Sequence, residues 1–149
     1  MQPYPHTYTA SANGSPNGVV AVDSKGCVTL RTAAPAQFGG PEGLWSPESL
    51  FCAAMANCFV LTFRSIARAS KLEWWDLTCN VEGTLERTAA EVSFTHFATT
   101  ATLEVPEEAD IGVCRTLLEK AERVCLIANS LKGSRSLQVQ INTRNLAFG

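Results

Sequence analysis

The order of apolar and polar residues predicts β-structure in the first 45 residues. The candidate strands are Thr7–Ser11, Val19–Val22 and Cys27–Arg31. Asp23-Ser24-Lys25-Gly26 predicts a hairpin turn between the last two strands, because glycine suits the end of a β-turn. A loop rich in Ala, Pro and Gly follows over residues 33–43.

A long helix is predicted from Ser46 to about Ser70. Ser46 can cap free backbone N–H groups, and Pro47 suits the first helical position, where its missing N–H is not needed. Glu48 faces the positive end of the helix dipole. The first half of the helix is apolar almost all round, so we expect it to be buried on most sides.

Two strands are predicted after this helix. In the first, Leu77, Cys79, Val81 and Leu85 alternate with polar residues. The second strand, Val92–Val105, changes its apolar phase near His96-Phe97. A phase change within one strand predicts a bulge or a bend at that point.

A second helix is predicted from Asp110 to about Ser130, followed by a last strand, Leu137–Ile141. Spacings of three and four residues place one apolar face on the helix: Ile111, Cys114, Leu118, Ala121, Cys125 and Ala128. Strands therefore occur in runs and do not alternate singly with helices. This order predicts an α+β protein with antiparallel sheet, folded as a single domain over residues 1–149.

Charge and composition exclude several classes of protein. The net charge is −2 and the basic residues are scattered, so we expect no nucleic-acid partner. Charged residues make up only 17% of the chain, which favours an oligomer that hides apolar surface. Residues 1–14 have no basic start and no apolar run, so we expect no secretory signal there. The longest apolar stretch, Leu50–Phe63, contains Asn57 and is too short to span a bilayer, so we expect a cytoplasmic protein without a membrane partner.

The chain has six cysteines: Cys27, Cys52, Cys58, Cys79, Cys114 and Cys125. In a chain of this size without a secretory signal, most of them should be reduced thiols. The sequence contains no C-x-x-C motif, and its two histidines, His6 and His96, are near no cysteine at zinc-ligand spacing. We therefore expect no metal site.

Two of these cysteines have distinctive settings: Cys58 lies in the middle of the apolar helix and Cys125 near the end of the second helix. Each could be a small core residue, because free cysteine is among the most buried residue types. However, residues 45–59 resemble the OsmC/Ohr family signature, which has a Pro-Glu-x-Leu helix start, an Ala-rich turn, and Cys-Phe ten residues after the Glu. Residues 121–130 resemble the second family motif, with Cys125 at its cysteine.

The resemblance implies both a fold and an activity. The fold would be the OsmC-like α+β fold, in which antiparallel sheets wrap around two central helices in an intertwined homodimer. The activity would be that of a thiol-dependent peroxidase for small organic hydroperoxides, with Cys58 as the attacking thiolate and Cys125 as the resolving thiol. An external dithiol, of the lipoyl type in the family, would reduce the resulting disulfide, and no cofactor is required.

The surroundings of the thiol would set the preference for organic over hydrogen peroxide. We expect an apolar environment made by Leu50, Phe51, Phe59, Phe63 and Val124.

Glu48 is the third candidate catalytic residue. It could act only on the helix dipole, or it could orient a basic partner. Ten residues of helix rise about 15 Å, so Glu48 cannot reach Cys58 of its own chain and would act on another subunit. Cys52, one turn after Glu48, is expected to be structural.

Departures from the family pattern leave other functions open. The family carries an arginine in an N-terminal turn or loop that lowers the pKa of the thiol, whereas the only arginine before Glu48 here is Arg31. Leu126 also stands where the family usually has Pro. The alternatives are a thiol redox sensor, an enzyme acting on another electrophile, and a binding protein in which Trp74 and Trp75 line an apolar pocket.

Overall fold

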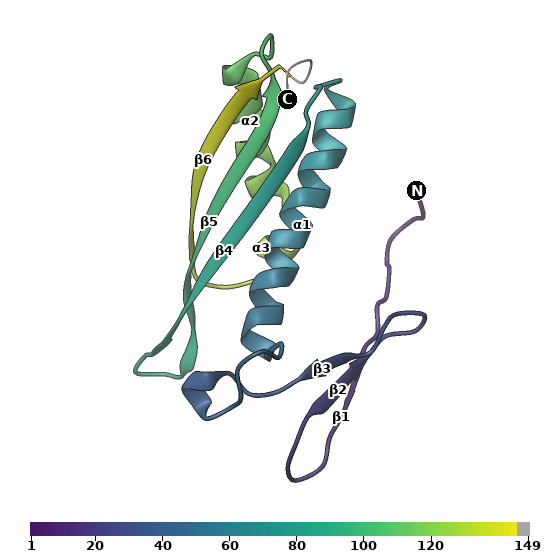
Figure 1. Ribbon diagram of the computed structural model, residues 1–149, viewed down its shortest axis with the longest axis vertical. Coiled ribbons are helices and arrows are strands. Elements are labelled where there is room, and N and C mark those ends of the chain that lie inside the picture. Colours follow the sequence, from purple (N-terminus) through teal and green to yellow (C-terminus); the bar gives the residue numbers. More distant parts are fainter. Residues whose placement is uncertain (146–149) are drawn as a thin grey trace. The chain divides into compact units, whose positions relative to one another are not determined.

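The computed structural model describes residues 1–145, and Figure 1 shows the order of their helices and strands. The chain divides into two compact units, Met1–Phe51 and Cys52–Gly149. The α+β class is confirmed, while one domain over the whole chain stays a prediction.

The first unit contains a three-stranded antiparallel sheet in the order β1-β2-β3. Its strands are β1 (Ser11–Asn13), β2 (Val20–Asp23) and β3 (Leu30–Thr32), and the short 3-10 helix η1 (Ala36–Phe38) follows. The predicted turn between β2 and β3 ends at Gly26, whose φ of 80° favours glycine. The predicted strand Thr7–Ser11 is wrong, because pairing with β2 begins only at Ser11.

Helix α1 (Pro47–Ala69) begins where the sequence predicts. Ser49 N–H donates to Ser46 Oγ at 3.1 Å, which caps the first turn. Every fourth residue is buried from Met55 through Phe59 and Phe63 to Ala67, so these side chains form one face. Burial on most sides is not observed within the chain, since Leu61 on another face is 50% exposed.

The length and composition of α1 bear on the expectation about membranes. With 23 residues, this helix is long and apolar enough to cross a bilayer, and only 22% of its most apolar window is buried within the chain. The core helix of a globular protein passes the same test. Part of the apolar surface of α1 is therefore left exposed by its own chain.

The second unit contains the sheet β4-β5-β6, formed by β4 (Asp76–Arg87), β5 (Val92–Pro106) and β6 (Ser134–Arg144). Strands β4 and β5 are antiparallel. His96 lies opposite Thr84, whereas Phe94 lies opposite Leu85, so Thr95 is the extra residue of a bulge. The predicted irregularity near His96 is confirmed.

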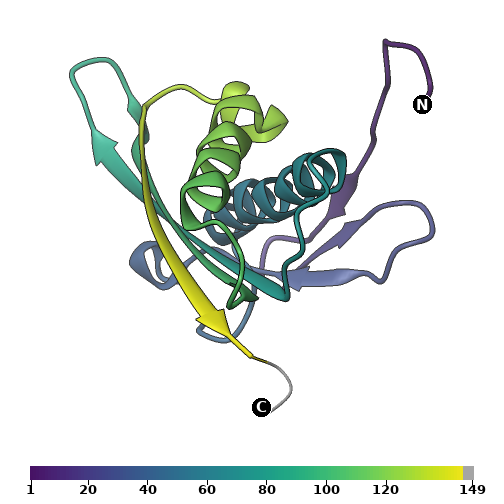
Figure 2. The same cartoon turned by 90° about the horizontal axis from the view of Figure 1, so that it is seen from above.

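Strand β6 pairs with β5 in parallel, which corrects the prediction of antiparallel sheet for this strand. Parallel strands need a crossover, and helices α2 (Ile111–Val124) and α3 (Leu126–Asn129) provide it. Figure 2 shows α1 and α2 side by side on one face of this sheet.

The hydrophobic core of the second unit lies between these helices and the sheet. Phe63 of α1, Leu103 of β5 and Leu118 of α2 are fully buried in one cluster. Both helices therefore have fixed positions on the sheet, and so do the cysteines that they carry.

Candidate active site

Cys58 lies in the middle of α1, next to the buried face of the helix. Its side chain is partly exposed, whereas that of Phe59 is 2% exposed. Cys58 Sγ is 3.8 Å from Thr62 Oγ1, one turn later on the same helix. A thiol in this position is open to a small molecule and also has a hydroxyl group beside it.

Cys125 interrupts the second helix, which corrects the prediction of a continuous helix to about Ser130. Its φ of −61° and ψ of 115° are extended, so α2 ends at Val124 and α3 begins at Leu126. Its side chain is 1% exposed. The first N–H groups of a helix have no acceptor within it, so the break frees backbone donors next to Cys125.

The tertiary fold brings Cys58 and the break together. Burial raises the pKa of the Cys58 thiol, but hydrogen bonds to its sulfur lower it by more, so its pKa lies below the ordinary value. The largest of these bonds comes from the Ile127 N–H, followed by the Cys125 thiol, the Thr62 hydroxyl and the Leu126 N–H. Within residues 1–145, no cation is among the groups that lower this pKa.

The pKa of Cys125 is shifted in the opposite direction. Burial raises it to about 11, and both the hydrogen bond to Cys58 and the charge of a Cys58 thiolate act in the same direction. Cys58 is therefore the accessible thiol that ionises first, and Cys125 is the shielded thiol that stays protonated beside it. The two thiols titrate as a coupled pair.

Three further residues around the pair were not singled out by sequence reasoning: Cys79 on β4, Glu122 on α2 and Arg135 on β6. Burial, together with the charges of Glu122 and Cys125, raises the pKa of Cys79 to about 12. Burial also raises the pKa of Glu122, against the nearby charge of Arg135. The sequence pattern could have pointed to Cys79 as a buried residue, because Cys79 shares its strand face with Leu77 and Val81.

These raised thiol pKa values predict that stability falls in alkali. A thiol in an unfolded chain has a pKa of about 8.5, so thiols with folded-state values near 11 and 12 stabilise the fold fully below pH 8.5 or so and lose that contribution as pH rises further. Urea unfolding between pH 8 and about 10.5 should show this decline. Cys79→Val should make the decline shallower. The control Val81→Ala, which removes no titratable group from the same strand face, should leave the pH slope unchanged, and an equal slope in all three proteins would contradict the prediction.

Leu126 offers a test of the backbone donors. Proline suits the first residue of a helix, and the extended backbone of Cys125 is compatible with a following proline. Leu126→Pro should therefore fold, but it removes one N–H donor from the Cys58 sulfur. We expect the midpoint of Cys58 alkylation by iodoacetamide to rise by up to about one pH unit. Leu126→Ala keeps the N–H and should titrate like the wild type; an unshifted midpoint in Leu126→Pro would contradict the role of this donor.

Glu48 is placed apart from the thiol pair along its helix. It lies in the first turn of α1, ten residues before Cys58, and one of its carboxylate oxygens is buried without a hydrogen-bond partner in the described chain. Cys52 packs over Gly83, where an added Cβ would lie 2.9 Å from Cys52 Sγ. This packing agrees with a structural role for Cys52.

The prediction that Phe59 and Phe63 line the surroundings of the thiol is wrong. Phe59 and Phe63 are buried in the core, and Phe63 packs edge to face against Trp74 with ring centroids 5.4 Å apart. These rings therefore fill the interior and do not line an open pocket. The exposed apolar side chains around the break are Val124, Leu126 and Ile127.

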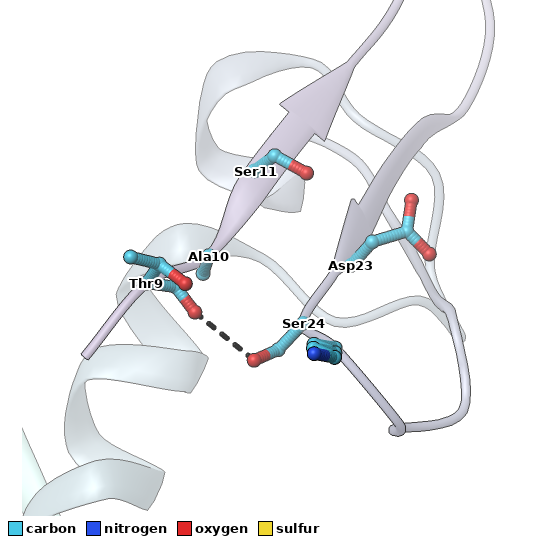
Figure 3. Close-up of a pocket in the computed structure, with 6 residues that line it drawn as sticks. Thr9, Ala10, Ser11, Asp23 and Ser24 are labelled. Carbon is cyan, nitrogen blue, oxygen red and sulfur yellow. Dashed lines mark hydrogen bonds between the residues drawn. The ribbon is translucent and has the colours of Figure 1, made fainter.

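No other described feature matches a cofactor or metal site. Residues 1–145 hold no group of three or more His, Cys, Asp or Glu side chains placed to bind a metal ion. An open pocket of about 250 Å³ lies in the first unit, lined by residues 9–11 and 23–25 (Figure 3). Its Ser24 hydroxyl donates to the Thr9 carbonyl at 3.0 Å, and it contains no thiol.

Comparison with known proteins identifies a family and a fold. The family model described as OsmC-like protein matches residues 40–140. The uncharacterized protein YmaD of Bacillus subtilis is 24% identical over 144 residues, which cover 93% of this chain and 95% of that protein.

Solved structures agree with this assignment. An OsmC-like protein of unknown function from Vibrio cholerae superimposes with a TM-score of 0.81 at 18% identity, covering 91% of this chain and 99% of the other. A structure from Legionella pneumophila, described as an organic hydroperoxide resistance protein OsmC and predicted redox protein, has a TM-score of 0.73 at 27% identity and covers 95% of this chain and all of its own. The overall fold is thus that of OsmC-like proteins.

Proposed function

The chain belongs to the OsmC-like protein family, and on this premise we propose that it is a thiol-dependent peroxidase that reduces organic hydroperoxides. The observation that carries the proposal is the pairing of two thiols with opposite pKa shifts. Cys58 is partly exposed with a lowered pKa, and it hydrogen-bonds with the buried Cys125. The thiolate is the reactive form of cysteine, so this arrangement favours Cys58 as the nucleophile.

The chemistry requires two steps at sulfur. The Cys58 thiolate attacks the distal oxygen of the hydroperoxide, the O–O bond breaks, and the alkoxide takes up a proton to leave as the alcohol. Cys58 is thereby oxidised to a sulfenic acid. The Cys125 thiol then condenses with the sulfenic acid, releasing water and forming a disulfide, and an external dithiol restores both thiols by exchange.

In this chain, hydrogen bonds lower the pKa of Cys58, a role that the family resemblance assigns to an arginine. The N–H groups of Ile127 and Leu126 are among the hydrogen-bond donors that lower the pKa of Cys58, because such donors favour the charged form of a group. Peroxidase chemistry therefore remains accessible although the chain lacks an arginine at the family's N-terminal positions. Val124, Leu126 and Ile127 expose apolar surface around the break, which would favour a substrate with a hydrocarbon part.

The test compares two peroxides on the reduced protein. We expect Cys58 to be oxidised faster by cumene hydroperoxide than by hydrogen peroxide, and dihydrolipoamide to sustain turnover. Intact mass after limited peroxide should show the loss of two hydrogens, mapped to Cys58 and Cys125. Slow oxidation without preference, or a stable sulfenic acid without a disulfide, would instead support a redox sensor.

We further propose that the protein works in the cytoplasm as a homodimer. A second copy would cover the open apolar surface of α1, where Leu61 is 50% exposed. It could also bring a basic group to Glu48, whose buried oxygen has no partner in the described part of its own chain. Glu48 would then orient a group at the thiol of the other subunit.

Light scattering should therefore give twice the chain mass of 16.0 kDa. Leu61→Lys should shift the protein towards the monomer, because a charge would then face the apolar interface. Lys71→Glu, an exposed change just beyond α1, is the control. A monomeric wild type would contradict the dimer and with it the role proposed for Glu48.

A further inference from the structure

Arg135 ties the last strand of the sheet to both sides of the helix break. Its Nε lies 3.2 Å from Glu122 Oε1 on α2, and its Nη2 donates to Asn129 Oδ1 on α3 at 3.1 Å. The Arg135 and Glu122 side chains are only 26% and 15% exposed. One guanidinium group on β6 thus holds two helices that are separated by Cys125.

Asn129 closes the same network across the break. Its Nδ2 donates to the carbonyl of Arg123, in the last turn of α2, at 2.9 Å. Asn129 is the last residue of α3, and its own N–H donates to the Cys125 carbonyl at 3.0 Å. The short helix is therefore fixed to α2 through Asn129 and to the sheet through Arg135.

We propose that Arg135 is a positioning residue that, through Asn129 and Glu122, holds the Leu126 and Ile127 N–H groups against the sulfur of Cys58. A helix of four residues has little stability of its own, so its orientation depends on such tertiary contacts. Hydrogen bonds weaken steeply when their angle or length changes, so a small rotation of α3 would remove these donors. This role rests on the function proposed above, because Cys58 is the nucleophile of that function.

A direct effect of the guanidinium charge does not explain this role. Arg135 is paired with Glu122, and no cation is among the groups of the described chain that lower the pKa of Cys58. The titratable groups that face the site are Cys125 beside Cys58, Glu122 beside Arg135, and Cys79, whose pKa is raised by the charges of Glu122 and Cys125. Arg135 thus acts through the backbone of α3.

The test measures the pH midpoint of Cys58 alkylation by iodoacetamide, followed at that residue by peptide mass spectrometry. Arg135→Gln and Asn129→Ala should each raise the midpoint by about one pH unit, which lowers the thiolate fraction at neutral pH about tenfold. Because both residues belong to one network, the double variant should shift little further than either single variant. Arg135→Lys, which keeps the charge but not the planar fork, should give an intermediate shift.

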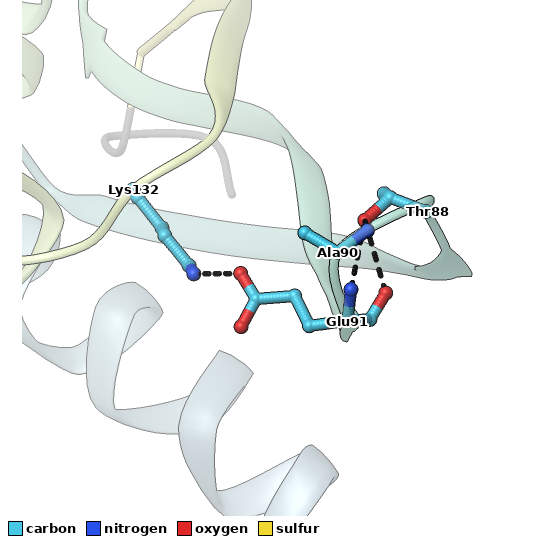
Figure 4. Close-up of polar contacts among 4 residues, drawn as sticks. All are labelled: Thr88, Ala90, Glu91 and Lys132. Carbon is cyan, nitrogen blue, oxygen red and sulfur yellow. Dashed lines mark hydrogen bonds and ion pairs between the residues drawn. The ribbon is translucent and has the colours of Figure 1, made fainter.

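Lys132→Met is the matched control. Lys132 lies three residues before Arg135 and pairs with Glu91 in an exposed ion pair, beside the turn in which the Glu91 N–H donates to Thr88 Oγ1 at 3.2 Å (Figure 4). Its removal should leave the Cys58 midpoint unchanged, since exposed pairs contribute little and Glu91 lies between β4 and β5.

A second readout is amide hydrogen exchange at Leu126 and Ile127, which should become faster in Asn129→Ala. Asn129 is exposed, so Asn129→Ala should fold. If Arg135→Gln does not fold, the Asn129→Ala variant decides the outcome. Unchanged midpoints in folded variants, or a shift in Asn129→Ala without one in Arg135→Gln, would overturn the role of Arg135. Alkylation does not require peroxide. A protein without peroxidase activity could therefore still show these shifts, so the test of Arg135 and the test of the proposed peroxidase can fail independently.

Discussion

Replacing Cys58 by serine is expected to reduce the consumption of cumene hydroperoxide by about three orders of magnitude or more, as the loss of a nucleophile does in other enzymes. Sulfur is the atom oxidised in the proposed reaction, and a hydroxyl group neither ionises near neutral pH nor accepts an oxygen atom from a peroxide. Peroxide consumption with dihydrolipoamide as reductant measures the effect.

Cys27→Ser is the control for this experiment, because Cys27 is an exposed thiol of the first unit. It should keep wild-type activity. Residual activity in Cys58→Ser above that of free thiols would show that another cysteine is the nucleophile. Loss of activity in both variants would show that the reaction does not depend on one positioned thiol.

Replacing Cys125 by serine is expected to abolish steady turnover while preserving the first oxidation of Cys58. The serine hydroxyl can still donate a hydrogen bond to the Cys58 sulfur, so the thiolate should remain favoured, but no thiol is then left at that position to condense with the sulfenic acid. Intact mass should show added oxygen on Cys58 in place of the loss of two hydrogens, followed by irreversible over-oxidation.

The outcome also tests whether Cys125 alone resolves the sulfenic acid. Cys79 is the next candidate, since its thiol lies close enough to feel the charge of Cys125. A disulfide that still forms in Cys125→Ser and disappears in Cys79→Val/Cys125→Ser would assign the resolving role to Cys79. Full turnover in Cys125→Ser would contradict the two-cysteine mechanism.

Local features of the fold were predictable where neighbouring residues decide the backbone. Ser46 and Pro47 set the start of α1, and the Ser46 cap is observed. The phase change at His96 predicted the bulge at Thr95, because a strand that keeps one buried face must insert a residue when its apolar phase shifts. The family signature around Cys58 similarly pointed to the correct family.

Other features were not predictable, because they depend on contacts between distant segments. The parallel pairing of β6 with β5 is determined by where the crossover helices pack, not by the alternation within β6. The interruption at Cys125 was missed because the apolar spacing of three and four residues continues across it from Ala121 to Ala128, and no proline marks the break. Phe59 and Phe63 were assigned to the thiol's surroundings, although their spacing of four places both on the core face.

The sequence by itself determined the main order of helices and strands apart from the break at Cys125, the α+β class and the two cysteines worth considering, because these depend on periodicity, caps and a short motif. Only the tertiary structure decided which groups surround Cys58. These groups are the backbone donors of Leu126 and Ile127 and the Arg135 contacts that fix α3. All of them come from residues more than 65 positions after Cys58 in the chain. Hydrogen bonds to a sulfur require positions and directions in space, and only the packing of α1, α3 and β6 supplies them.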